Sequence, residues 1–224
     1  MSLGIGDRSI ERYVELARGH AEQLLPMIDA VLAEGGIALT SLDAIAFGRG
    51  PGGFTGVRLA ASVAQGLAFG AEVGVVPISD LAAVAQRVKQ LDPRLVRVLA
   101  VNDARMREVY WGEFHFDGDF GGPMPWGGER VGPAADVPLP DGPGPDAHEP
   151  RLWAAAGRGL KAWPALAERC RAAGALDVFA ELLPRASEVL ALARPLVAAG
   201  RMLDAAEALP VYVRDRVAEP APQT

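Results

Sequence analysis

The sequence has 224 residues, half of which are apolar, and its formal net charge is −6. A chain of this length and apolar content can bury a core as one large domain or two small lobes, which excludes wholesale disorder. The acidic balance argues against an autonomous nucleic-acid binder, because such proteins carry a basic field that replaces phosphate counterions.

The N-terminal half predicts strands that alternate with helices. An apolar stripe at helical spacing begins at His20, and the glycines Gly35 and Gly36 end it. Ser79 is a suitable N-cap for a later helix. We therefore expect strands at 9–16, 44–48 and 73–78, and helices at 20–34, 54–70 and 80–90.

The second half repeats this order. Its strands are apolar or aromatic, and its helices carry apolar stripes. We expect strands at 95–101, 108–116, 153–156 and 176–179, a glycine-rich hairpin after residue 116, and helices at 160–173 and 187–199. Two rounds of strands and helices predict two related α/β lobes. The expected division is 1–101 for the N-terminal lobe, 102–209 for the C-terminal lobe, and 210–224 for a closing extended segment with a disordered tail.

The stretch from Pro133 to Pro150 contains six prolines and four acidic residues. This composition is typical of a mobile surface connection.

A glycine-rich segment follows the strand expected at 44–48. Residues 47–58 contain five glycines and one proline, which permits a tight strand-to-helix turn. Free N–H groups at the start of the next helix could hold a phosphate. The segment lacks the Gly-Lys-Ser/Thr of a P-loop, so a turn that simply needs small residues is the favoured interpretation.

The helix expected at 54–70 is apolar nearly all round. Val57, Ala61, Ala64 and Ala68 share one face, and Leu59, Val63 and Leu67 share another. A helix buried on one side only would show a polar stripe. We therefore expect this helix to be covered on two sides, by its own sheet and by either the preceding helix or a partner chain.

Groups that could perform catalysis are sparse. The three histidines are His20, His115 and His148, and they form no metal-binding pair on a helix. Asp103 and Arg105 could form an ion pair at a hinge between the lobes or contact a ligand in the cleft, and we favour the structural role. We expect no catalytic residues and no metal site in this chain.

The single cysteine, Cys170, cannot form an internal disulfide, which suits a reducing compartment. The N-terminus lacks the basic-then-apolar pattern of a signal peptide. The most apolar run, 59–71, is too short to cross a bilayer. We expect a cytoplasmic protein without a membrane contact.

Four motifs, in order along nearly the whole chain, resemble the signature of the TsaB family. They begin at His20 (His-Ala-Glu-Gln-Leu-Leu-Pro-Met-Ile), Phe47 (Phe-Gly-Arg-Gly-Pro-Gly-Gly-Phe-Thr-Gly-Val-Arg, with Ala-Gln-Gly-Leu-Ala from Ala64), Asp103 (Asp-Ala-Arg-Met-Arg-Glu-Val-Tyr) and Pro210 (Pro-Val-Tyr-Val-Arg).

The resemblance implies a two-lobed α/β fold of the actin-like, sugar-kinase-like (ASKHA) ATPase class. It also implies a non-catalytic, dimerising subunit that pairs with TsaD and TsaE to place threonylcarbamoyl on a tRNA adenosine. The isolated chain would form a homodimer and contact tRNA only indirectly, and ATP or ADP would bind only in the complex. The residues expected at the partner interface are His20, Leu24, Met27, Ile28, Phe54, Thr55, Val57, Arg58, Ala61, Ala64, Gln65 and Ala68.

This sequence departs from the family pattern at its start. Family members first carry a strand that ends in Asp-Thr-Ala/Ser. This sequence begins instead with Met-Ser-Leu-Gly-Ile-Gly-Asp-Arg, so we expect that strand to be missing. The strand would lie centrally in the sheet of the N-terminal lobe, so its loss would leave unpaired backbone groups. We expect reduced stability or an abnormal oligomer, and no nucleotide binding by this chain alone.

Two rival functions are an independent ATP-dependent kinase of the same fold and a peptidase, as the older name "glycoprotease-like" would imply. Tight ATP binding with turnover would favour the kinase, and cleavage of casein would favour the peptidase.

Overall fold

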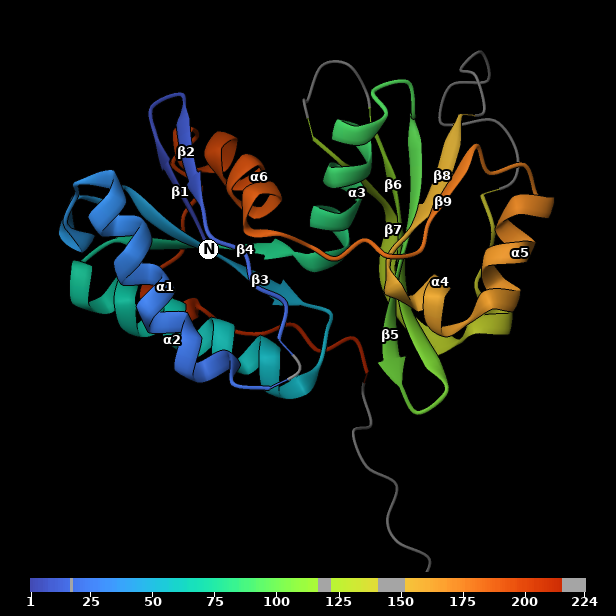
Figure 1. The fold of residues 1–224 in the computed structure, drawn as a ribbon, viewed down its shortest axis with the longest axis horizontal. Coiled ribbons are helices and arrows are strands. Elements are labelled where there is room, and N and C mark those ends of the chain that lie inside the picture. Colours follow the sequence, from blue (N-terminus) through green and yellow to red (C-terminus); the bar gives the residue numbers. More distant parts are fainter. Residues whose placement is uncertain (17, 117–121, 141–151, 215–224) are drawn as a thin grey trace, which may run out of the picture.

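The computed structural model describes residues 1–16, 18–116, 122–140 and 152–214, which form two lobes side by side (Figure 1). Each lobe combines β-sheet with helices packed against it. The helices are α1 (His20–Gly35), α2 (Phe54–Ala71), α3 (Asp80–Leu91), α4 (Arg158–Ala162), α5 (Pro164–Ala172) and α6 (Ala186–Ala198). The strands are β1 (Ser2–Ile5), β2 (Arg8–Glu11), β3 (Ala44–Gly50), β4 (Gly74–Ser79), β5 (Arg97–Arg105), β6 (Glu108–His115), β7 (Met124–Pro133), β8 (Trp153–Ala156) and β9 (Asp177–Phe179).

The second lobe is built on one five-stranded sheet in the order β7-β6-β5-β8-β9. The pairs β5–β6 and β6–β7 are antiparallel, whereas β8 runs parallel to both β5 and β9. Apolar side chains of α3 pack on one face of this sheet, and those of α4 and α5 pack on the other. The central strand β5 is therefore buried on both faces, which explains its continuous apolar run from Val98 to Val101.

The first lobe contains two separate two-stranded sheets, an antiparallel β1–β2 hairpin and a parallel β3–β4 pair. Helix α2 covers one face of the β3–β4 pair, where Ala61, Ala64 and Ala68 contact Phe47 and Val75. Helix α6 covers the other face through Ala193. No ladder joins β1 to β3 within the described residues.

Several sequence expectations need correction. The strand expected at 9–16 is β2 and ends at Glu11, and its partner β1 was not anticipated. The glycine-rich hairpin contains a full strand, β7. The helix expected at 160–173 is divided into α4 and α5, because Pro164 lacks an N–H and begins a new helix.

The expected lobe boundaries also differ from the structure. The division between residues 101 and 102 falls inside β5, which belongs entirely to the second lobe. Helix α6, assigned to the second lobe, packs against β3 and β4 of the first lobe. The chain thus returns to its starting lobe. Part of the connection expected at 133–150 is ordered, since Val137 is buried in the core of the second lobe. Residues 141–151 and the expected disordered tail lie outside the described residues.

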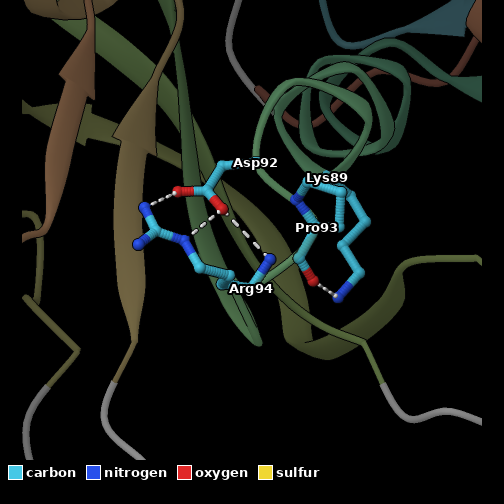
Figure 2. A network of polar contacts seen from close by, with 4 residues as sticks. All are labelled: Lys89, Asp92, Pro93 and Arg94. Atoms are coloured by element: carbon cyan, nitrogen blue, oxygen red, sulfur yellow. Dashed lines mark hydrogen bonds and ion pairs between the residues drawn. The ribbon is translucent and has the colours of Figure 1, made fainter.

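A short polar network closes the turn between α3 and β5 (Figure 2). Lys89 Nζ donates to the carbonyl oxygens of Pro93 and Leu95 at 2.7 and 2.8 Å, so it holds the end of the helix against the turn. Asp92 accepts from the Arg94 guanidinium at 2.9 and 2.8 Å. These bonds lower the pKa of Asp92 to about 2. The Arg94 side chain is exposed, so this pair shapes the turn and adds little stability.

None of the helices within the described parts of the chain has the length and apolar character needed to cross a membrane.

Candidate functional site

The glycine-rich segment forms a tight turn at the end of β3. Gly50 has a φ of +101°, and a Cβ at this position would lie 3.2 Å from the Val211 carbonyl oxygen. Glycine is therefore required at this point of the turn. By contrast, Gly53 caps α2 with extended backbone, and nothing lies within 4 Å of a Cβ built there.

A buried carboxyl fills the inside of this turn. A Cβ built on Gly48 would lie 2.1 Å from Asp80 Oδ1, so β3 needs a glycine there to admit the carboxyl. The Gly50 N–H donates a hydrogen bond to Asp80. The Asp80 carboxyl already occupies the turn, and in its ionised form it would repel a phosphate there. The favoured interpretation of the segment, a turn that needs small residues, agrees with this geometry.

The environment of Asp80 is acidic as well as buried. Asp80 keeps some exposed surface as a residue, but its carboxyl group is enclosed by the turn and β3. Burial, and after it the charge of nearby Glu129, raise the pKa of Asp80 from 3.8 to about 7, although Arg49 and the Gly50 N–H act in the opposite direction. Glu129 belongs to β7 and accepts hydrogen bonds from Arg49 at 3.1 Å and from the Ser79 hydroxyl. Arg49 and Ser79 belong to the first lobe and Glu129 to the second, so this cluster joins the two lobes next to the turn.

Helix α2 has two unlike faces. Its small-residue face is turned toward its own sheet, where Val57, Ala61, Ala64 and Ala68 are all less than 7% exposed. The assignment of these four residues to a partner interface is therefore wrong, because the protomer itself covers them. The exposed residues of α2 are Phe54, Thr55, Gly56, Arg58, Ser62, Gly66, Phe69 and Gly70.

The other residues expected at the partner interface differ in their exposure to solvent. His20, Phe54, Thr55 and Arg58 are exposed, and Leu24, Met27 and Gln65 are half-buried. Ile28 is buried, so its assignment to a partner surface is also wrong. Of the twelve residues, those that stay available to a partner are His20, Leu24, Met27, Phe54, Thr55, Arg58 and Gln65.

The C-terminal segment 209–214 runs from the start of α2 to the second lobe. The Arg58 guanidinium lies 3.6 Å from the centre of the Phe54 ring, and its Nε donates to the Tyr212 hydroxyl at 2.6 Å. Two residues later, Arg214 pairs with Glu108 and donates to the Ala104 carbonyl at 3.3 Å. This strap, residues 209–214, therefore holds both lobes. The sequence indicated it only as a motif.

The strap borders a cleft of about 730 Å³ between the lobes, lined by residues that include Asp103 and Arg105. Arg105 lies 3.2 Å from Asp103, and its backbone N–H donates to the Asp103 carboxyl at 3.0 Å. Both residues belong to β5, so the pair closes a turn and does not join the lobes as a hinge. Three consecutive residues from Arg105 to Arg107 have φ between +49° and +64°, an uncommon backbone for side chains other than glycine.

The cations that line the cleft are already engaged. Arg158 lies 2.6 Å from Glu15, and Lys161 lies 2.7 Å from Glu181. Arg105 and Arg214 have the carboxylate partners given above. An anionic ligand would therefore have to displace an existing ion pair.

The described residues contain no group of three or more His, Cys, Asp or Glu that could hold a metal ion. His115 is buried, with its Nε2 at 3.1 Å from Glu113 and its ring centre 4.5 Å from that of Trp126 at a tilt of 40°, so it is a core residue. His148 lies outside the described residues. Cys170 is buried in α5, and burial raises the pKa of its thiol to about 11, as expected for an unreactive cysteine.

Comparison with known proteins resolves the family. The chain is 36% identical over 219 residues to the tRNA threonylcarbamoyladenosine biosynthesis protein TsaB of Escherichia coli, covering 95% of this chain and 88% of that protein. The chain belongs to the TsaB family. The TsaB protein of Haemophilus influenzae is 55% identical over 100 residues, 44% of this chain and 42% of that protein. The model of the family described as TsaD, tRNA N6-adenosine threonylcarbamoyltransferase, matches residues 14–122.

Solved structures agree with membership of the TsaB family. A protein from Pseudomonas aeruginosa, described as uncharacterized with similarity to peptidase YEAZ, superposes with a TM-score of 0.83 at 42% identity. The match covers 95% of this chain and 93% of that one. The structure of YeaZ from the same organism gives a TM-score of 0.81 at 41% identity, over 94% and 92% of the two chains. The fold is consistent with the actin-like ASKHA class expected from the sequence.

Proposed function

We propose that this chain is a subunit of the machinery that makes threonylcarbamoyladenosine in tRNA, and that it supports a TsaD partner without catalysing the reaction itself. Membership of the TsaB family supports the pathway, since the Escherichia coli relative is named for that biosynthesis. The match of residues 14–122 to the TsaD family supports a paralogous partner of similar fold.

The exposed face of α2 is the observation that supports a docking role. Gly56, Gly66 and Gly70 lie on this helix, and nothing is within 4 Å of a Cβ built at any of them. Glycine inside a helix costs about 1 kcal/mol relative to alanine. Since no contact within the protomer requires these glycines, close approach by a helix of a partner accounts for them. Phe69, 80% exposed between Gly66 and Gly70, supplies apolar area for the same contact.

The partners and ligands follow from this role. TsaD would pack on α2 and the accessible residues of α1, and TsaE would join the assembly. A second copy would take the same surface when the chain is alone. The net charge of −6 favours indirect contact with tRNA, through the partner. ATP or ADP would bind in the complex, because the turn before α2 already holds the Asp80 carboxyl.

Gly66→Arg is expected to abolish pairing with TsaD and leave the fold intact. The arginine side chain would project from the exposed face of α2 and prevent close helix approach, and replacing a helical glycine removes a local penalty. Co-purification with TsaD and a reconstituted tRNA modification assay measure the loss. A melting temperature within about 2 °C of wild type would show that the lobe is folded.

Ala172→Arg is the matched control, since Ala172 is exposed on α5 in the second lobe. It should leave both pairing and modification unchanged. Normal pairing by the Gly66→Arg variant would refute the docking surface. Tight ATP binding with turnover by the isolated chain would favour a kinase, and casein cleavage abolished by a single substitution would favour a peptidase.

A further inference from the structure

The hairpin between β5 and β6 turns on two residues with large side chains. Arg105 is paired with Glu108, so Met106 and Arg107 form a two-residue loop, and their φ angles are +49° and +64°. A two-residue loop with positive φ at both positions is a type I′ turn, which is ordinarily made by Asn-Gly. Methionine and arginine are disfavoured in this backbone. The turn by itself would therefore be more stable with asparagine and glycine.

The side chains of this hairpin tip, residues 105–107, are presented to solvent. Met106 is 70% exposed, and the Arg105 side chain is 86% exposed beside Asp103. Arg107 is also exposed and makes no hydrogen bond or ion pair with the described residues. Because these side chains disfavour the turn and bury little surface within the protomer, contact with another molecule accounts for them better than internal packing does.

The strap joins the hairpin tip to the exposed start of α2. Arg214 donates to the Met106 Sδ at 3.3 Å, and Tyr212 contacts Arg58 and Phe54 of α2. Tyr212 and Arg214 are two residues apart, so their Cα atoms lie within about 7 Å of each other. In Figure 1 the strap passes from α2 toward the β5–β6 hairpin. The exposed face of α2, the strap and the hairpin tip therefore form one continuous surface over both lobes.

The part of this surface around the strap is basic, although the whole chain has a net charge of −6. It carries four arginines and two carboxylates, and both carboxylates are engaged by arginines of the same surface. Arg58 and Arg107 have no carboxylate partner among the described residues. A partner that contributes carboxylates would complement both guanidinium groups. The charged residues around the strap are Arg58, Asp103, Arg105, Arg107, Glu108 and Arg214.

An acidic protein segment fits this surface better than a nucleic acid does. Two more arginines than carboxylates make a weak basic field for binding a phosphate backbone. The rings of Phe54 and Tyr212 are 5.9 Å apart, and the Arg58 guanidinium covers the Phe54 ring, so little ring surface is free to stack on bases. The exposed thioether of Met106 suits contact with an apolar side chain.

We propose that the partner bound on α2 also lays an acidic segment across the strap onto the hairpin tip. Its carboxylates pair with Arg58 and Arg107, and an apolar side chain contacts Met106. This second contact rests on the proposed docking of TsaD on α2, and it extends that interface onto the second lobe. Exposed charge pairs at the rim of an interface are weakened by salt.

Arg107→Glu is expected to weaken pairing of the 224-residue protein with TsaD about fivefold at about 50 mM salt, because a carboxylate would then face the acidic segment. The loss should shrink to less than about twofold at about 500 mM salt, where exposed charges are screened. Titration calorimetry measures both. Arg171→Glu is the matched control, since it reverses another exposed arginine of the second lobe, on α5. It should pair like wild type.

A double variant separates binding from folding. Met106→Asn combined with Arg107→Gly creates the pair favoured in this turn, so the melting temperature should rise by about 2–4 °C. Pairing with TsaD should nevertheless weaken about fivefold at low salt, because both contacting side chains are gone. A more stable protein that pairs normally would show that the hairpin tip has only a structural role, and that result overturns the proposal.

The proposal is also overturned if Arg107→Glu pairs like wild type at low salt, or if Arg171→Glu weakens pairing equally. Unchanged pairing of Arg107→Glu together with weaker tRNA binding by the assembled complex would assign the surface to RNA instead. Gly66→Arg separates this proposal from the docking on α2. If Gly66→Arg abolishes pairing and Arg107→Glu does not weaken it, only the acidic segment is refuted. Normal pairing by Gly66→Arg refutes both.

Discussion

Ala64→Glu is expected to unfold the protein or to lower its free energy of unfolding by about 4 kcal/mol. Ala64 is 4% exposed and packs with Phe47 and Val75 beneath α2. A glutamate there would place an unpaired charge in an apolar core. Because small domains are stable by only about 5–15 kcal/mol, this loss removes a large share of the total. Urea unfolding followed by circular dichroism measures it.

Ser62→Glu, two residues away on the exposed face of the same helix, is the control. It should change the free energy of unfolding by no more than about 0.5 kcal/mol. Equal unfolding midpoints for Ala64→Glu and wild type would mean that the small-residue face of α2 is not packed on the sheet. The comparison therefore tests the orientation of α2 on which the docking surface depends.

Asp80→Asn is expected to stabilise the protein at pH 8 by up to about 4 kcal/mol. The pKa of Asp80 is raised from 3.8 to about 7 in the folded protein, chiefly by burial. The folded state therefore binds a proton more tightly than the unfolded state. Wild-type stability from this group is greatest below about pH 4 and falls as the pH rises from about 4 to 7. Asparagine has nearly the same shape, has no charge to bury, and keeps an oxygen for the Gly50 N–H.

The measurement is the free energy of unfolding of both proteins between pH 5 and 8. The variant should gain most at pH 8 and less than half as much at pH 5, because the unfolded carboxyl already ionises near pH 4. Asp92→Asn is the control of opposite sign, since hydrogen bonds from Arg94 lower the pKa of this carboxyl to about 2. It should give no stabilisation at pH 8. A variant at Asp80 that is less stable than wild type at pH 8 would show that the carboxylate is a favourable partner of Arg49.

Much of the fold was predictable because local patterns agreed with the tertiary structure. The helix from His20 ends at Gly36 in left-handed backbone, and Ser79 accepts from the Ala82 N–H as its N-cap. The strand β5 was recognised by its apolar run. The strand β7 was missed because its glycines and polar residues lack alternation, and its place is set by pairing with β6.

The candidate site was less predictable, for a physical reason. Periodicity divides α2 into faces but does not say which one meets the sheet, and the small-residue face was assigned to a partner when it lies inward. The cluster of Arg49, Glu129 and Asp80 joins residues far apart in sequence, so no local pattern could reveal it. The four motifs identified the segments that form the candidate site. Which of their side chains remain accessible to a partner depends on tertiary packing.

The strap gives this protein a mechanical property. Tyr212 is anchored to α2 of the first lobe through Arg58, and Arg214, two residues later, is anchored to the second lobe through Glu108. Because only one residue separates the two anchored side chains, the strap cannot lengthen much. A change in the angle between the lobes must therefore displace Tyr212 relative to Phe54 and Arg58. Phe54 and Tyr212 are 44% and 46% exposed beside the face of α2. A change in the opening of the cleft would therefore alter the surface that a protein bound there contacts.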